Sequence, residues 1–429
     1  MFVHRRMLGR FWSVGALLLA VAAMGAPASA AKQGAPAGLV WPNRVSKANS
    51  DDWIRLHHDQ IRQMRPRLLV LNFVNGLSAQ EARQKVERLI AAIREGSRYH
   101  GYQDPKAPAF LEYQVAKIVD LTDPAPLPPD QRLDGNSSFY PRVPNWKEGL
   151  NFRYEELFGS RFARYYGFSD PQHPDRFLLL ADLVNRGLVH EVWFLAKQGN
   201  YGAPFECTEV KQAYAAAFHK IPGKWVQAGN GGTDKQPWIG RSLRILFINA
   251  ERGPGCAMES LSHAIEGTSN SGAIPYFTRY FVPYAMFDLK RRYGMPFNSL
   301  YEREGGTEVS YPTPDSMVYT WQGKQYTVHP YMPAGGSVHF TPTGRRDYDM
   351  DNPASIYSTI EHYGLHDGPG GRDRAELWNG TKFARYRQLA NDCMGPWLVY
   401  WRQNFPGFGN KARDDHDRPM KNWWPFLFY

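Results

Sequence analysis

The sequence predicts an α/β fold, in which a mostly parallel sheet is flanked by helices and followed by an irregular, aromatic-rich C-terminal half. Two stretches carry this prediction. Residues 67–121 show a strand pattern, a helix pattern and a second strand pattern, which is the order found in parallel sheets. Residues 242–268 read as a strand, a turn and a helix. The strand part, residues 243–248, is apolar without alternation, as expected for a strand covered on both faces.

The first unit begins with a strand over residues 67–73, with the sequence RLLVLNF. A helix is expected to start at Ser78, because Glu81 completes an S-x-x-E capping box, and to end at Gly96. The next strand is expected over residues 113–121. This order of elements predicts that the two strands are parallel.

Later patterns extend the sheet. We expect a loop over residues 122–151, a helix over 177–185, a strand over 188–196 and a helix over 209–219. Polar residues follow the predicted strand ends, namely Asn72, Asn75, Lys197, Asn200, Asn249, Glu251 and Arg252. Because ligands of α/β sheets bind beyond the carboxyl ends of strands, we expect a site at this edge.

The second half is less regular and holds many of the aromatic residues, which make up 14% of the chain. The patterns predict a helical segment over residues 274–292, a hairpin over 318–328 around Gly323, and a helical segment over 378–405 that breaks at Gly395-Pro396. There is no internal repeat, so we expect one α/β domain over residues 67–429, preceded by a lead-in segment over 31–66 with a helix over 51–64.

Residues 1–30 have the pattern of a secretory signal peptide. Three arginines precede an apolar run over residues 14–24, and Ala28-Ser29-Ala30 supplies a small-residue cleavage site. We therefore expect cleavage near Ala30 and a secreted or periplasmic protein. The apolar run is too short for a stable membrane span, and no other segment is long and apolar enough.

Charge and cysteine content restrict the function further. The net charge is +10, and the mature chain would carry +7 after loss of the three leader arginines. The chain has no dense run of Lys and Arg, so nucleic acid is not an expected partner. The three cysteines, Cys207, Cys256 and Cys393, permit at most one internal disulfide and lack paired zinc-type spacing.

The helix after residue 253 carries the candidate site. Glu259, His263 and Glu266 stand at i, i+4 and i+7, so they share one face. His263 and Glu266 are predicted metal ligands, and His339, in a glycine-flanked VHF segment, is the predicted third. A solvated face of an amphipathic helix is the alternative, because Met258 and Leu261 begin a separate apolar stripe.

The catalytic roles are predicted from the neighbouring charged residues. Glu259 or Glu251 would act as the base for a bound water, and Arg252 would stabilise developing negative charge. The sequence lacks several known catalytic and cofactor-binding motifs, namely G-x-S-x-G, the phosphate loop, G-x-G-x-x-G and H-E-x-x-H.

Two other clusters have ligand-like spacing. Asp347, Asp349 and Asp351 alternate as in calcium loops, although the EF-hand pattern fails at its sixth and twelfth positions, so a looser calcium site or a polar turn is expected. His362 and His366 are four residues apart, but Gly364 between them weakens the helix that a shared metal would need.

Several stretches resemble a group of exported bacterial proteins for which no activity is known. These are EVWFL at residues 191–195, FINAERG…E…SHAIE at 247–266, GSVHFTP…RDYDMDNP at 336–353 and NWW at 422–424. The resemblance implies that the helix with Glu259 and His263 and the segment with His339 belong to one unit.

The leading hypothesis is an exported hydrolase that uses a divalent metal, zinc first, to act on an extracellular polymer, either peptide or glycan. Two alternatives stay open. One is a metal-free glycoside hydrolase that uses paired carboxylates, and the other is a non-catalytic protein that binds carbohydrate or the cell envelope through its aromatic residues.

Overall fold

The computed structural model describes residues 38–46, 51–128, 134–143, 152–198, 204–231, 236–303, 308–366, 368 and 371–429. The predicted signal peptide with its cleavage site near Ala30 lies outside the described residues, as does Asn200. Residues Gly38–Tyr429 belong to one structural unit. Among the described residues, no helix combines the length and apolar character needed to cross a membrane.

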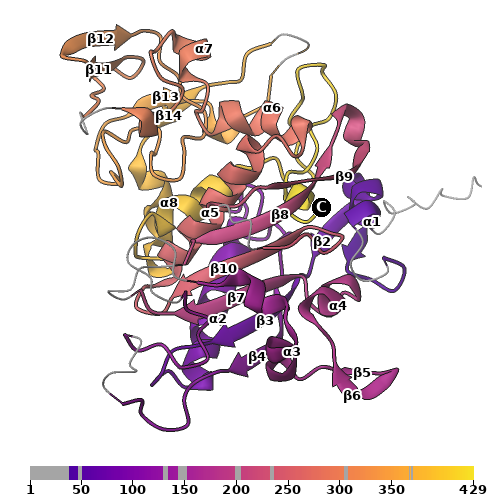
Figure 1. The fold of residues 1–429 in the computed structure, drawn as a ribbon. Coiled ribbons are helices and arrows are strands. Elements are labelled where there is room, and N and C mark those ends of the chain that lie inside the picture. The colour runs from indigo at the N-terminus through magenta and orange to yellow at the C-terminus, as the bar shows by residue number, and fades with distance from the viewer. Residues whose placement is uncertain are drawn as a thin grey trace, which may run out of the picture. The chain divides into compact units, whose positions relative to one another are not determined.

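A six-stranded sheet with the order β4-β3-β7-β10-β8-β9 organises this unit (Figure 1). Strands β4, β3, β7 and β10 are parallel, whereas β8 and β9 pair antiparallel. The prediction of a mostly parallel α/β sheet is therefore confirmed. The strands are β3 (Arg67–Asn72), β4 (Gln114–Asp120), β7 (Glu191–Ala196), β8 (Cys207–Tyr214), β9 (Lys220–Gln227) and β10 (Leu243–Asn249).

Helices cover both faces of the sheet, as the unbroken apolar strands predict. Alternate residues of β3 face different cores: Leu68 and Val70 lie in one core, and Leu69 and Leu71 lie in the other. The first core is completed by α2 (Ala79–Gly96), α5 (Pro254–Asn270), α6 (Pro275–Tyr284) and α8 (Gly395–Gln403). The second is completed by α3 (Ser160–Tyr166) and α4 (Leu180–Asn185).

The capping box at the start of α2 is confirmed. The Ser78 side chain accepts a hydrogen bond from the backbone N–H of Glu81, and the Glu81 carboxylate accepts one from the backbone N–H of Ser78. Helix α2 packs against α5 and α8, so this locally encoded helix supports the layer that carries the candidate site.

The predicted helix over residues 209–219 is wrong, because residues 207–214 form β8. Glu209 and Lys211 are both buried in the sheet. The Glu209 carboxylate lies 2.8 Å from the Arg244 guanidinium of β10 and 3.1 Å from the Lys211 ammonium. Charged side chains that pair with each other therefore occupy positions where a buried strand normally has apolar residues.

The irregular C-terminal half is also confirmed, with corrections to its elements. The hairpin around Gly323 forms as β11 (Met317–Trp321) and β12 (Lys324–Val328). The segment over 274–292 divides into α6 and α7 (Leu289–Tyr293), because Met286 between them adopts a left-handed φ of 61°. The segment over 378–405 divides into a 3-10 helix, Gly380–Gln388, and α8.

The predicted helix over 51–64 ends early, at Leu56, because Ile61 and Met64 pair as a buried strand with β1. The remaining elements are β1 (Leu39–Trp41), α1 (Asp51–Leu56), β2 (Ile61–Met64), β5 (Ser169–Asp170), β6 (His173–Phe177), β13 (Ile356–Ser358), β14 (Glu376–Trp378) and the 3-10 helices His58–Gln60, Tyr154–Phe158, Ala216–Phe218, Leu300–Glu302, Ile360–His362 and Trp424–Leu427.

Candidate metal centre

Helix α5 begins directly after the turn that ends β10. Asn249 closes the strand, and its side-chain oxygen accepts a hydrogen bond from the backbone N–H of Glu251. Pro254 occupies the first turn of the helix, where a missing N–H costs nothing. The helix is then buried around most of its surface, including Glu259 and Glu266. The alternative in which this face lies in water is therefore wrong.

Three side chains converge on one point beside α5. The Nε2 atoms of His263 and His339 lie 2.9 Å apart, and Nε2 of His339 lies 3.4 Å from Oε1 of Glu259. The three ligand atoms all lie within 4.8 Å of one another. Metal bonds of 2.0–2.1 Å in tetrahedral geometry place ligand atoms about 3.3 Å apart. The structure therefore brings Glu259, His263 and His339 together with the spacing of a three-residue metal site.

Glu266 lies on the opposite side of the His263 ring. One carboxylate oxygen is 3.1 Å from Nδ1 of His263, and the other accepts a hydrogen bond of 2.9 Å from the backbone N–H of Val338. This arrangement favours the His263 tautomer with its proton on Nδ1, which leaves the Nε2 lone pair facing the cluster. Glu266 is thus placed to orient a ligand, whereas the sequence predicted that it would be one.

Two opposing effects set the pKa of His263. Burial lowers it, but the hydrogen bond and the charge of Glu266, with help from other carboxylates, outweigh burial and raise the pKa above its usual value. His339 has a carboxylate beside its second ring nitrogen too, since Oδ1 of Asp347 lies 3.7 Å from Nδ1. His263 therefore has the hydrogen-bonded acidic partner that is typical of metal-binding imidazoles, whereas Asp347 is a nearby exposed charge.

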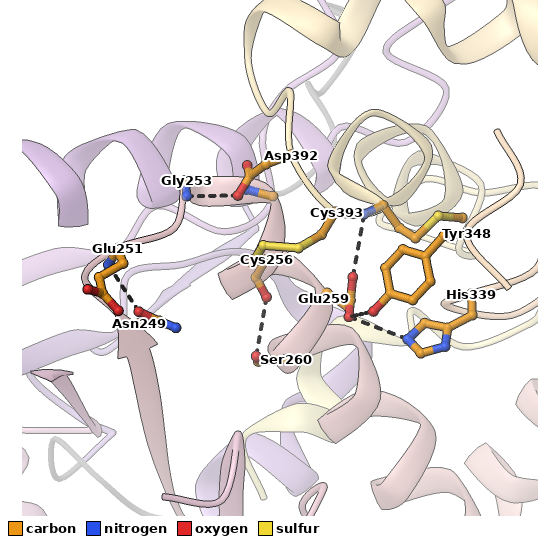
Figure 2. Close-up of a disulfide and its surroundings, with 12 residues drawn as sticks. Asn249, Glu251, Gly253, Cys256, Glu259, Ser260, His339, Tyr348, Asp392 and Cys393 are labelled. Atoms are coloured by element: carbon orange, nitrogen blue, oxygen red, sulfur yellow. Dashed lines mark hydrogen bonds and ion pairs between the residues drawn. A yellow bond between two sulfur atoms is a disulfide. The ribbon is translucent and has the colours of Figure 1, made fainter. Parts of the chain in front are cut away.

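Glu259 is held in its ionised form. Burial raises the pKa of this carboxyl. Hydrogen bonds from His339 and Tyr348 lower the pKa by more than burial raises it, so the net shift is downward. The Tyr348 phenol donates a hydrogen bond to Oε1 (Figure 2). The backbone N–H of Met394 donates one to Oε2 at 3.4 Å. Burial and the hydrogen bond to Glu259 raise the pKa of Tyr348, so the phenol keeps its proton.

Glu251 and Arg252 lie outside this cluster. Both are exposed in the turn before α5, and the Glu251 carboxylate lies 3.7 Å from the Lys197 ammonium, at the end of the neighbouring strand β7. Figure 2 shows Glu251 beside Asn249, apart from Glu259 and His339. The strand ends do meet as predicted, but α5 carries Glu259 and His263 away from that edge.

The other predicted clusters have separate partners. The Asp349 carboxylate lies 2.6 Å from Arg345, Asp351 pairs with Arg387 at 2.9 Å, and Asp347 faces His339. A shared calcium ion between these aspartates therefore stays a prediction. His362 pairs with Glu376 at 3.1 Å, and His366 pairs with Asp373 at 3.3 Å, so these two histidines face different carboxylates.

A cavity of about 520 Å³ opens beside His263 and Glu266. Its other lining residues are Gly229, Asn230, Gly267, Asn270, Phe287, Asn298, Ser299, Tyr301 and Glu302. Asn230 donates a hydrogen bond to the Glu206 carboxylate. Two larger cavities, of about 900 and 820 Å³, include none of the three converging residues. Because of this position, the smaller cavity is the candidate substrate pocket.

The sequence did not point to Tyr348, Asn230 or Glu206 as parts of this site. Tyr348 lies within the segment that was singled out for its aspartates, and its left-handed φ of 59° turns it toward Glu259. No local spacing pattern identifies such residues, because each reaches the site from a different segment of the chain.

Comparison with known proteins gives no match, either to a model of a protein family or to a curated sequence. The resemblance of several stretches to exported bacterial proteins therefore stays a prediction, and the geometry of the cluster is what supports a function.

Proposed function

We propose that this protein is an exported hydrolase that uses a divalent metal to cleave an extracellular polymer, either peptide or glycan. The convergence of Glu259, His263 and His339 carries this proposal. Two imidazoles and one carboxylate leave a coordination position open, which distinguishes a catalytic zinc site from a closed structural one. Zinc in this position would polarise a substrate oxygen and lower the pKa of a water molecule to about 7.

The carboxylates near the Nδ1 atoms of His263 and His339 favour a metal site over a cluster held together by hydrogen bonds alone. A neutral histidine pair needs only one proton between its two Nε2 atoms, but here Glu266 and Asp347 also lie at the Nδ1 atoms. A carboxylate that is hydrogen-bonded to Nδ1, as Glu266 is at His263, fixes the ring and makes the other nitrogen a better ligand. The ionised state of Glu259, which burial alone would oppose, supports the same role.

We assign the general base to Glu206, because Glu259 lies among the ligands and Glu251 lies outside the cluster. Asn230 lines the cavity and holds the Glu206 carboxylate. The negative charge of Glu206 interacts with the imidazole of His263 and the phenol of Tyr348. We therefore propose that the Glu206 carboxylate, which Asn230 holds beside the cavity, accepts a proton from water during hydrolysis.

The cavity supports a polar, uncharged substrate segment. Its wall offers the amides of Asn230, Asn270 and Asn298, the hydroxyl of Ser299, and the ring of Tyr301. Amides and hydroxyls match the peptide groups or sugar hydroxyls of a polymer, and an aromatic wall suits a sugar face or an apolar side chain. Among the described residues, the lining includes neither Lys nor Arg.

Elemental analysis of the purified protein after exchange into metal-free buffer tests the proposal. We expect near-stoichiometric zinc in the wild type, and loss of zinc in His263→Ala and His339→Ala. His329→Ala is the matched control, because this histidine is 61% exposed and lies outside the cluster. Iron in place of zinc would redirect the search toward oxygen-dependent chemistry, since the same ligand set binds Fe(II) in oxygenases.

The activity test follows from the metal result. Peptide, ester and polysaccharide libraries should be screened with and without a chelator, and zinc should restore any activity that the chelator removes. If the wild type binds no divalent metal, the proposal fails, and glycoside hydrolysis without metal or carbohydrate binding becomes the better explanation.

A further inference from the structure

A disulfide fastens a distant segment of the chain to the first turn of α5. Cys256 and Cys393 are 137 residues apart in sequence, and their Cα atoms lie 5.0 Å apart. Cys256 is three residues before Glu259, so the bond attaches next to the carboxylate of the candidate metal centre. The third cysteine, Cys207, is buried and free.

Residues 392–394, named here the 392–394 segment, contact both the start of α5 and Glu259. The Asp392 carboxylate accepts hydrogen bonds from the backbone N–H groups of Gly253 and Gly255, at 2.7 and 2.8 Å, and so caps the helix from outside. Two residues later, the backbone N–H of Met394 donates a hydrogen bond to Oε2 of Glu259. The 392–394 segment thus contacts both the start of α5 and the proposed metal ligand Glu259.

The fit between this segment and α5 is tight. A Cβ atom at Gly255 would lie 2.0 Å from the carbonyl oxygen of Asp392, so the glycine is needed for the close approach. Cys393 has a φ of 46°, a left-handed conformation that non-glycine residues rarely adopt. Such a conformation persists when the surroundings enforce it, and the covalent bond to Cys256 is one such restraint.

We propose that the 392–394 segment positions Glu259 and that the metal centre is complete only while the Cys256–Cys393 disulfide is intact. This inference depends on the proposed metal site. Without the disulfide, Cys393 is free to leave its left-handed conformation, and Met394 then withdraws its N–H from Glu259. Residues that orient metal ligands typically contribute 10- to 100-fold in affinity, so a loss of that size is expected.

The redox step is a two-electron exchange. A dithiol reductant gives two electrons and two protons to the disulfide, which yields the two cysteine thiols and the cyclic disulfide of the reductant. Thiols persist in reducing compartments, and disulfides form outside them. A chain exported after synthesis would therefore bind its metal tightly only after oxidation, which limits activity to the outside of the cell.

The test compares zinc affinity, measured by competition with a chromophoric chelator, in wild type and Cys256→Ala/Cys393→Ala. Alanine removes the disulfide and also the thiols, which lie beside Asp392 and would otherwise offer a second zinc site. We expect a 10- to 100-fold loss in the double variant and less than a threefold change in the control Cys207→Ala. Far-UV circular dichroism verifies that each variant is folded.

A double-mutant cycle shows whether the effect passes through Glu259. In a Glu259→Gln background, removal of the disulfide should change zinc affinity less than threefold. Asp392→Ala keeps the disulfide but removes the two hydrogen bonds that join the 392–394 segment to the start of α5. It should weaken zinc binding several-fold even if the cysteine variant does not fold.

Equal zinc affinity with and without the disulfide would overturn this inference and leave the metal site itself standing. Absence of zinc binding in the wild type would instead overturn the proposed function, and this inference with it.

Discussion

Replacement of Glu266 by glutamine should weaken zinc binding 10- to 100-fold while the ligand set stays intact. Each oxygen of Glu266 accepts from one donor, Nδ1–H of His263 at 3.1 Å and the N–H of Val338 at 2.9 Å. Glutamine has only one acceptor oxygen, so one of these two donors must face an NH₂ group. A 10- to 100-fold loss corresponds to about 1.4–2.7 kcal/mol of binding free energy.

The same substitution should shift the titration of His263 in the metal-free protein. Burial lowers the pKa of this histidine, and Glu266 is the main group that raises it. Without the negative charge, burial dominates, so the pKa should fall from above its usual value toward or below about 6.5. Calorimetric zinc titration and NMR titration of the imidazole measure the two effects on one sample.

Glu302→Gln is the matched control, since Glu302 lines the same cavity with an exposed side chain. It should leave both quantities unchanged. If Glu266→Gln abolishes zinc binding as completely as His263→Ala, Glu266 is itself a ligand, as the sequence predicted. If neither the affinity nor the pKa moves, the positioning role is refuted.

Three further outcomes are expected. Arg244→Met removes a buried guanidinium that lies 3.1 and 2.8 Å from two buried carboxylates. Urea unfolding should show that this variant loses roughly 3–5 kcal/mol of unfolding free energy. Arg387→Met breaks an exposed pair and should lose less than about 1 kcal/mol. Burial raises the pKa of Glu376, but hydrogen bonds with Glu361, Lys382 and His362 outweigh burial and lower the pKa to about 2. The ionised Glu376 carboxylate stabilises the folded state fully above about pH 4.5, and this stabilisation is lost as pH falls toward 2. The melting temperature of Glu376→Gln should therefore drop less in acid than that of the wild type. Gly255→Ala should destabilise by about 1–3 kcal/mol through overpacking, which a thermal melt would detect.

The sequence predicted those elements whose signals are local. The capping box of Ser78 and Glu81 identified the start of α2 because both partners lie within one helical turn. The apolar strands β3, β7 and β10 were recognisable because burial on both faces leaves an unbroken apolar run. Spacing on α5 likewise found Glu259 and His263, since residues four apart share a face.

The prediction failed where partners are distant in the chain. Strand β8 looked like a helix because its charges, Glu209 and Lys211, gave no sign of the buried Arg244 that they accompany. Tyr348 and Met394 come from other segments and meet Glu259 only in the folded chain. The prediction of Glu251 and Arg252 depends on the rule that strand ends of α/β sheets often bind ligands. The cluster of Glu259, His263 and His339 lies further along α5.

The buried charges on α5 are themselves an argument for function. A helix in the middle of an aromatic and aliphatic core is most stable with apolar side chains, and well-packed hydrophobic residues often replace buried ionic groups without loss of stability. Helix α5 instead buries Glu259 and Glu266 and places His263 between them. Each carboxylate then needs its own donors, Tyr348 for one and the Val338 backbone for the other. A fold that requires this many compensating contacts around one helix face gains little stability from them, whereas a metal ion would be held by the same groups.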